Sequence, residues 1–178
     1  SNGTIFIYDV DTIDGGDREY ANRIAALRDL LAERPDLNTF LEPNASGMAV
    51  ETTLPFLPVF PAAQVIRAQP QYVELDGLTG ISYITVFRQG VGPFVANEFM
   101  LTFQGVSDNG DTVITAVFPV EANVFPQEEP ANLDFDVFME TYETYMVESV
   151  EALTVASSDD FTPSLDTLTQ LISNLAYE

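Results

Sequence analysis

The chain has 178 residues and a formal net charge of −22, with 28 acidic and six basic residues and no Cys, His or Trp. This composition excludes thiol nucleophiles, Ser-His triads, Cys/His zinc sites and imidazole ligands for haem or copper. Because all six basic residues are arginines and acids dominate, nucleic acid and acidic membranes are poor partners for such a surface.

The N-terminal region predicts a strand followed by a helix. Ser1-Asn2 is typical of the remnant left when an expression tag is cut off. A strand is expected over residues 4–10. Apolar positions at helical spacing then predict an amphipathic helix over 18–34, which Pro35 ends.

Four acids lie in the connection between this strand and this helix: Asp9, Asp11, Asp14 and Asp17. They supply the hard oxygen ligands that calcium prefers, so they form a candidate calcium site. Their spacing departs from an EF-hand loop, which requires a ligand where Ile13 stands. The favoured interpretation is a solvated connection whose acids stabilise the N-terminus of the helix.

Residues 41–63 mix Pro, Gly, Asn and Ser with Phe and Leu, which predicts an irregular strap over the surface. Pro55, Pro58 and Pro61 recur at the polyproline II period of three. Such a segment is a candidate ligand for an aromatic groove, but a basic residue is missing. The intervening apolar side chains favour a strap that packs on its own domain.

Two hairpins are predicted after the strap. The first joins a strand over 65–75 to one over 81–89, and the second joins 98–106 to 111–120. The second turn contains Asp108, Asn109 and Asp111, which offer another possible metal site. Asn-Gly with flanking acids is also what a solvated hairpin turn requires, and this interpretation is favoured.

Alternation in the strand over 81–89 predicts its place in the sheet. Ile81, Tyr83 and Phe87 lie on one face, and Ile84 and Val86 lie on the other. A strand that is apolar on both faces is expected at the centre of a sheet covered on both sides.

Two further helices are predicted near the C-terminus, one over 133–153 and one that starts with Thr162 as N-cap and Pro163 at N1. We therefore expect residues 1–178 to form one α+β domain. Its antiparallel sheet of four or more strands, drawn from 65–120, is sandwiched between helices.

The sequences LPVFPAAQV at 57–65, GISYIT at 80–85 and FQGVSDNG at 103–110, with FPV at 118–120, resemble a group of bacterial exported lipoproteins of undefined function. The order of elements is similar to the sandwich shared by the PsbP and Mog1 proteins. These resemblances imply an extracytoplasmic address, a lipid-bearing Cys upstream of the sequence, and an accessory or binding role. They supply no catalytic residues.

Arg67 and Arg88 are the basic residues beyond position 34, and both fall on predicted strands. They are candidate contacts for an anionic ligand. The favoured alternative is that each neutralises a neighbouring acid, as Arg88 would with Glu98.

Two adjacent acid pairs, Glu128-Glu129 and Asp159-Asp160, raise the alternative of a carboxylate-based hydrolase. Adjacent acids rarely converge on one bond, and a glycosidase needs two carboxyls that face each other across a sugar cleft. The sequence therefore favours a non-catalytic extracytoplasmic module that binds a protein, glycan or small molecule, with calcium-dependent adhesion as another alternative. We expect no bound transition metal and no organic cofactor.

Overall fold

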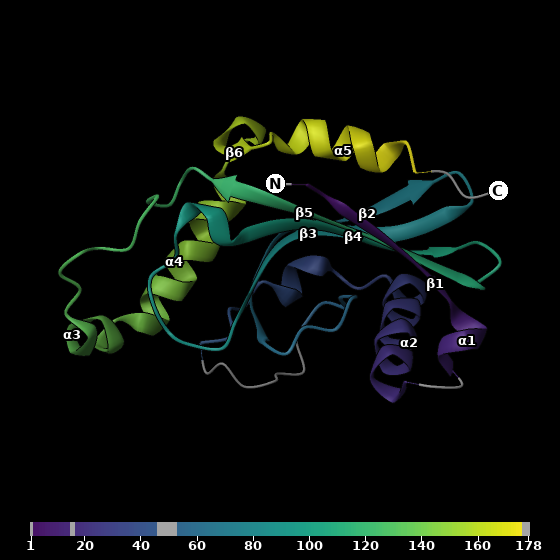
Figure 1. The fold of residues 1–178 in the computed structure, drawn as a ribbon, viewed down its shortest axis with the longest axis horizontal. Coiled ribbons are helices and arrows are strands. Elements are labelled where there is room, and N and C mark those ends of the chain that lie inside the picture. The colour runs from purple at the N-terminus through teal and green to yellow at the C-terminus, as the bar shows by residue number, and fades with distance from the viewer. Residues whose placement is uncertain (1, 15–16, 46–52, 176–178) are drawn as a thin grey trace.

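The computed structural model describes residues 2–14, 17–45 and 53–175. Within these ranges the strands form one antiparallel sheet in the order β1-β5-β4-β3-β2, and a short strand β6 pairs with the end of β5 (Figure 1). The strands are β1 (Thr4–Asp9), β2 (Ala63–Leu75), β3 (Leu78–Arg88), β4 (Phe99–Ser107), β5 (Thr112–Ala122) and β6 (Phe161–Thr162).

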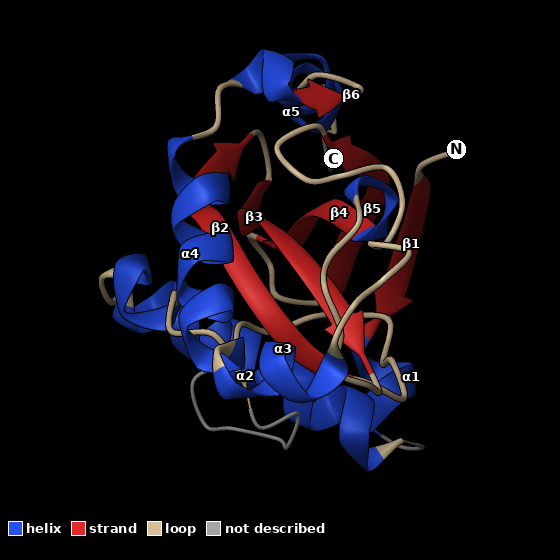
Figure 2. Cartoon of the chain, turned by 90° about the vertical axis from the view of Figure 1, so that its left-hand side faces the viewer, coloured by secondary structure: helices blue, strands red, loops and turns tan. Residues whose placement is uncertain are grey.

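Helices cover both faces of this sheet. In Figure 1, α5 lies above the sheet and α2 below it, while α4 runs beside β2, as the turned view of Figure 2 also shows. This arrangement confirms the predicted α+β fold with an antiparallel sheet between helices. The helices are α1 (Val10–Asp14), α2 (Arg18–Glu33), α3 (Phe135–Glu140), α4 (Tyr142–Val155) and α5 (Leu165–Ser173), with 3-10 turns η1 (Leu37–Phe40), η2 (Ala96–Glu98) and η3 (Ser158–Asp160).

The sheet separates two hydrophobic cores. Ile84 and Val86 of β3 belong to the core that α4 and α5 complete, whereas Ile81 and Tyr83 belong to the core that α2 completes. The alternation predicted for β3 is therefore confirmed. Both faces of the sheet are apolar, so helices on only one face would leave the apolar side chains of the other face in water.

The strap, defined here as residues 53–61, packs on its own domain as predicted. Leu54, Phe56 and Leu57 are buried in the α2-side core. Polar side chains of the sheet bind its backbone: Gln64 Oε1 accepts from Leu54 N at 2.9 Å, Tyr83 Oη donates to Pro55 O at 2.7 Å, and Gln104 Oε1 accepts from Leu57 N at 2.9 Å. Residues 46–52 of the predicted strap lie outside the described residues.

The helix predicted over 133–153 is two helices, which is a correction. Thr141 has φ −112° and ψ 5°, and its backbone N–H and its hydroxyl both donate to Phe138 O. A hydroxyl that bonds locally to the backbone competes with helix continuation. The apolar spacing runs across this break, so periodicity alone did not reveal it.

The last helix begins two residues later than predicted. Thr162 is not its N-cap, because it pairs with Glu121 as part of β6. Ser164 is the N-cap instead, and its Oγ accepts from Thr167 N at 3.4 Å. Among the described residues, no helix combines the length and apolarity that a membrane crossing needs.

Candidate functional site

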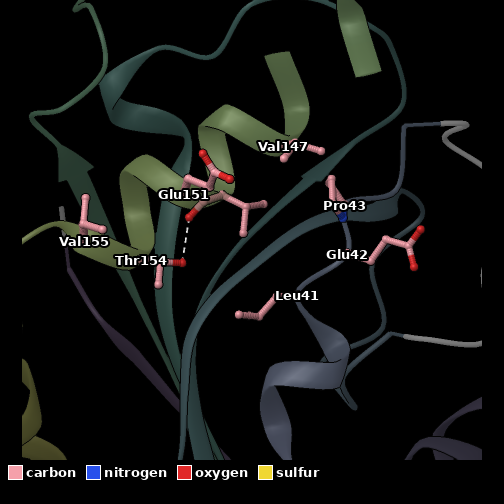
Figure 3. A pocket seen from close by; sticks show the side chains of 8 residues that line it. Leu41, Glu42, Pro43, Val147, Glu151, Thr154 and Val155 are labelled. Atoms are coloured by element: carbon pink, nitrogen blue, oxygen red, sulfur yellow. Dashed lines mark hydrogen bonds between the residues drawn. The ribbon is translucent and has the colours of Figure 1, made fainter. Parts of the chain in front are cut away.

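A groove of about 540 Å³ lies between α4 and the segment that follows η1 (Figure 3). One wall is made by residues 41–43 and the other by the C-terminal half of α4. Most of the lining side chains are aliphatic or proline. The lining residues are Leu41, Glu42, Pro43, Val147, Val150, Glu151, Thr154 and Val155.

Arg67 of β2 holds the first wall in place. Its side chain is fully buried, and Nε donates to Phe40 O at 2.9 Å, Nη1 to Gln64 O at 2.9 Å, and Nη2 to Glu42 O. Burial lowers the pKa of the Arg67 guanidinium, an effect that Tyr83 and Glu42 partly oppose. Three of its N–H groups donate to backbone carbonyls and the side chain is buried, so Arg67 is a clamp for the chain leaving η1 and is inaccessible to a ligand.

Gln69 of β2 holds the second wall. It lies where the β2 register shifts between Ala68 and Gln71, with a left-handed φ of 48°. Its Nε2 donates to Leu153 O at 2.7 Å and to Ala156 O at 3.0 Å. These bonds satisfy carbonyl groups at the C-terminus of α4, which have no partners within the helix. One strand therefore positions both walls of the groove.

The open groove exposes apolar surface and carboxylates together. Val147 and Val155 are 47% and 83% exposed, although burial of a valine side chain lowers the free energy. Thr154 Oγ1 donates to Val150 O at 2.7 Å, so its proton is already used. Figure 3 shows Glu42 and Glu151 pointing away from each other on the two sides of the groove. No basic residue lines it among the described residues.

Arg88 lies apart from the groove and is part of a local ion pair. Its Nη2 pairs with Glu98 Oε2, and its Nε donates to Glu98 Oε1 at 3.1 Å, which confirms the expected Arg88–Glu98 pair. Nη1 donates to Gly92 O at 2.6 Å, and the guanidinium carbon lies 4.3 Å from the Phe94 ring centre. The guanidinium therefore organises the loop between β3 and η2.

The four acids of the candidate calcium site lie around α1, an element that the sequence did not predict. Asp9 Oδ1 accepts from Thr12 N at 3.0 Å, and Asp17 Oδ1 accepts from Glu19 N at 3.0 Å as the N-cap of α2. Asp11 lies in the first turn of α1. Asp17 thus has the capping role of the favoured interpretation, whereas Asp9 binds the first turn of α1 instead. No group of three or more potential metal ligands comes together in the described part of the chain, which excludes the Asp14 side chain, so the calcium site stays a prediction.

The turn between β4 and β5 uses its polar residues to close the hairpin. Asn109 Oδ1 accepts from Ser107 Oγ at 2.6 Å and from Asp111 N at 3.1 Å. Gly110 has φ 78°, and its carbonyl accepts from Arg28 Nη2 of α2. Asp108 N donates to Gly77 O at 3.0 Å, which joins the two hairpin turns.

The two adjacent acid pairs occupy separate turns. Glu128 and Glu129 are exposed in the connection that follows β5. Asp160 in η3 accepts from both the backbone N and the hydroxyl of Ser157 at 2.7 Å, and these hydrogen bonds lower the pKa of the Asp160 carboxyl. Its neighbour Asp159 is exposed in the same turn, and neither acid lines the groove.

Sequence reasoning missed the groove and, apart from Arg67, the residues that build it. Arg67 carried a signal, because it is a single charge inside the apolar run from Val65 to Ala68. Gln69 before Pro70 carried a weaker one, since proline in a strand is confined to edges and bulges. Val147, Glu151 and Val155 look like ordinary helix-surface residues until the fold places them opposite residues 41–43.

No protein-family model, curated protein or solved structure matches this chain. The resemblances to exported lipoproteins and to the PsbP and Mog1 sandwich therefore stay predictions.

Proposed function

We propose that this protein is a non-catalytic extracytoplasmic binding module whose groove takes an apolar segment that carries positive charge. The observation that carries the proposal is an open apolar groove bordered by two carboxylates in a chain of net charge −22. An extended or helical peptide with aliphatic side chains and flanking arginine or lysine has this chemistry.

Exposed valines support the apolar half of the proposal. Burying the accessible part of Val147 and Val155 under a ligand removes apolar surface from water, which is worth about 25 cal/mol per Å². The walls are already held by Arg67 and Gln69, so little ordering of the protein is needed on binding. A preformed site retains more of the gross interaction energy as affinity.

Charge supports the cationic half. Glu42 and Glu151 attract a positive group from either side of the groove, and the field of the whole chain raises the local concentration of cations. Their separated orientation supports binding more than paired-carboxylate hydrolysis, which requires the two groups to converge on one bond. The extracytoplasmic address rests on the resemblance to exported lipoproteins.

The test uses two fluorescent peptides that share a leucine-rich sequence and differ only in arginine or glutamate flanks. Fluorescence anisotropy should show binding of the arginine-flanked peptide and none of the glutamate-flanked one. Val155→Ser should weaken binding about tenfold, because it removes roughly one to two buried methylene equivalents of apolar contact. Val137→Ser on α3, where valine is 56% exposed outside the groove, should leave the affinity unchanged.

A second pair of variants separates the groove from diffuse attraction. Glu151→Gln and Glu148→Gln remove the same charge from neighbouring exposed positions of α4, but only Glu151 lines the groove. We expect a several-fold loss for Glu151→Gln and almost none for Glu148→Gln. Equal losses for the two variants, or equal affinity for both peptides, would contradict the proposal.

A further inference from the structure

Among the described residues, no strand pairs with β1 on the side away from β5, which leaves an edge of the sheet on the side away from the groove. Strand β1 pairs with β5 from Thr4 to Asp9 without a register shift. Val10 N donates to Asp111 O at 3.0 Å in the same register. Hydrogen-bonded residues alternate along an antiparallel pair, so the backbone groups of Ile5, Ile7 and Asp9 point away from β5, toward the free edge.

The side chains of this edge are unusually apolar for their exposure. Ile5 and Ile7 are 49% and 70% exposed. Their side chains lie on the same face of the sheet, because residues two apart in a strand point to the same side. The strand has no Lys, no Pro and no bulge, which are the devices that normally block pairing at an exposed edge. Its single charge is Asp9 at the C-terminal end.

We propose that β1 pairs antiparallel with β1 of a second copy of this chain, so that two sheets join into one across a two-fold axis. This inference is independent of the groove. In the register we assign, Phe6 lies opposite the same residue of the other copy, and Ile5 lies opposite Ile7. Both isoleucines have outward backbone groups, so each such pair forms two hydrogen bonds.

Side-chain pairing selects this register. Ile5 and Ile7 from two copies form one apolar cluster, Tyr8 faces Thr4, and Asp9 faces Gly3. A shift by two residues in one direction places Asp9 opposite Ile5, and a shift in the other direction leaves Ile7 opposite Gly3. The assigned register places both isoleucines of each copy in apolar pairs, whereas either shift pairs one of them with Asp9 or Gly3.

The charge along β1 itself favours a second copy over a basic strand from another protein. Although the field of the whole chain attracts cations, a basic strand would find no acid to pair with along this edge before Asp9. Two copies repel through their net charge of −22, yet they approach along a strip that is almost uncharged. Added salt should therefore tighten the dimer by screening this repulsion. A symmetric edge also satisfies the self-complementarity that a two-fold interface requires.

Sedimentation and light scattering over a concentration series test the proposal. The chain should approach about twice its mass of 19.6 kDa, at lower concentration when sodium chloride is added. Ile7→Lys should make the protein monomeric, because it places a cation and a long side chain on the edge. Val137→Lys adds the same charge at an exposed valine of α3 and should leave the dimer intact. A monomer at every concentration, or a dimer that tolerates Ile7→Lys, overturns the proposal.

A cysteine test reads the register directly, because the chain has no native Cys. Phe6→Cys places two thiols at a non-hydrogen-bonded pair on the axis, where Cα atoms about 4.5 Å apart fall within disulfide range. Mild oxidation should give a covalent dimer. Thr4→Cys, whose two copies are separated along the strand, should not cross-link. Cross-linking by Thr4→Cys but not by Phe6→Cys would contradict the assigned pairing.

Discussion

The strands at the two edges of the sheet, β2 and β1, are built in opposite ways. β2 has a bulge at Gln69, and its side chains hold α4 and the segment after η1 against it. β1 is regular, has no bulge and exposes Ile5 and Ile7. The polar side chains of Arg67 and Gln69 thus turn one edge into a groove with fixed walls, while the other edge keeps its backbone available for pairing.

The largest expected effect comes from breaking the clamp at β2. Arg67→Met keeps much of the side-chain volume but leaves three backbone carbonyls without their donor. We expect a loss of about 3 kcal/mol in the free energy of unfolding, since hydrogen bonds to a charged group are worth about 1.5 to 3 kcal/mol each and are not additive. Urea unfolding measures it.

Arg34→Met is the matched control for this clamp. Arg34 pairs with Glu74 at 2.6 Å, but both side chains are largely exposed, so the expected loss is about 0 to 1 kcal/mol. Similar losses for the two variants would show that Arg67 does not act as a buried clamp.

The next effect concerns the bulge. Gln69→Ala removes two hydrogen bonds to the end of α4 and should cost about 1 to 2 kcal/mol in urea unfolding. Gln69→Gly should cost less, because glycine adopts the left-handed φ of this position without strain. Gln71→Ala, at an exposed position of the same strand, should change little. A larger loss for Gln71→Ala than for Gln69→Ala would show that the bulge residue is not what holds the end of α4.

A smaller effect is expected from Tyr8 on β1 at alkaline pH. Burial raises the pKa of the Tyr8 phenol to about 12, with Tyr20 adding to the shift. Because the unfolded value is about 10, the folded state holds the proton more tightly. Its contribution to stability is complete below pH 10 and is lost as the pH rises toward about 12. Burial raises the pKa of Tyr83 as well, which acts in the same direction.

Urea unfolding at a series of alkaline pH values measures this dependence. Tyr8→Phe removes one titrating group, so its stability should fall less steeply above pH 10 than that of the unchanged protein. An unaltered slope would show that the two states bind the Tyr8 proton equally.

The smallest expected effect on stability is at the open edge. At a concentration where the protein is monomeric, Ile7→Lys should change the free energy of unfolding by no more than about 0.5 kcal/mol, as is usual for exposed positions. Ile114→Lys, which places the same cation at a buried position of β5, should unfold the protein. A large loss for Ile7→Lys would show that β1 is already covered.

Local signals explain why the sheet was predictable. Asn109-Gly110 marks a hairpin turn, and alternation in β3 assigns its side chains to two faces before any partner is known. The break at Thr141 and the strand pairing of Thr162 were not predicted, and one reason explains both. Each depends on a competing hydrogen bond that periodicity does not report.

The groove was not predictable, because it arises between segments far apart in the chain. Arg67 was expected to contact an acid or an anionic ligand, and instead it binds carbonyls of residues 40, 42 and 64. Its odd position in an apolar run indicated a special role but not which role. Val155 is recognised as a groove residue only when α4 is placed beside residues 41–43.

The strap has a consequence for how the protein opens. Leu54 and Leu57 donate their amide protons to the side chains of Gln64 and Gln104 rather than to another strand. Lifting the strap would leave the buried side chains of Gln64 and Gln104, and the Tyr83 hydroxyl, without their partners on the strap, so detachment alone is costly. The strap and the sheet should therefore open as one cooperative unit, and the Leu54 and Leu57 amides should exchange with deuterium as slowly as those of the central strands.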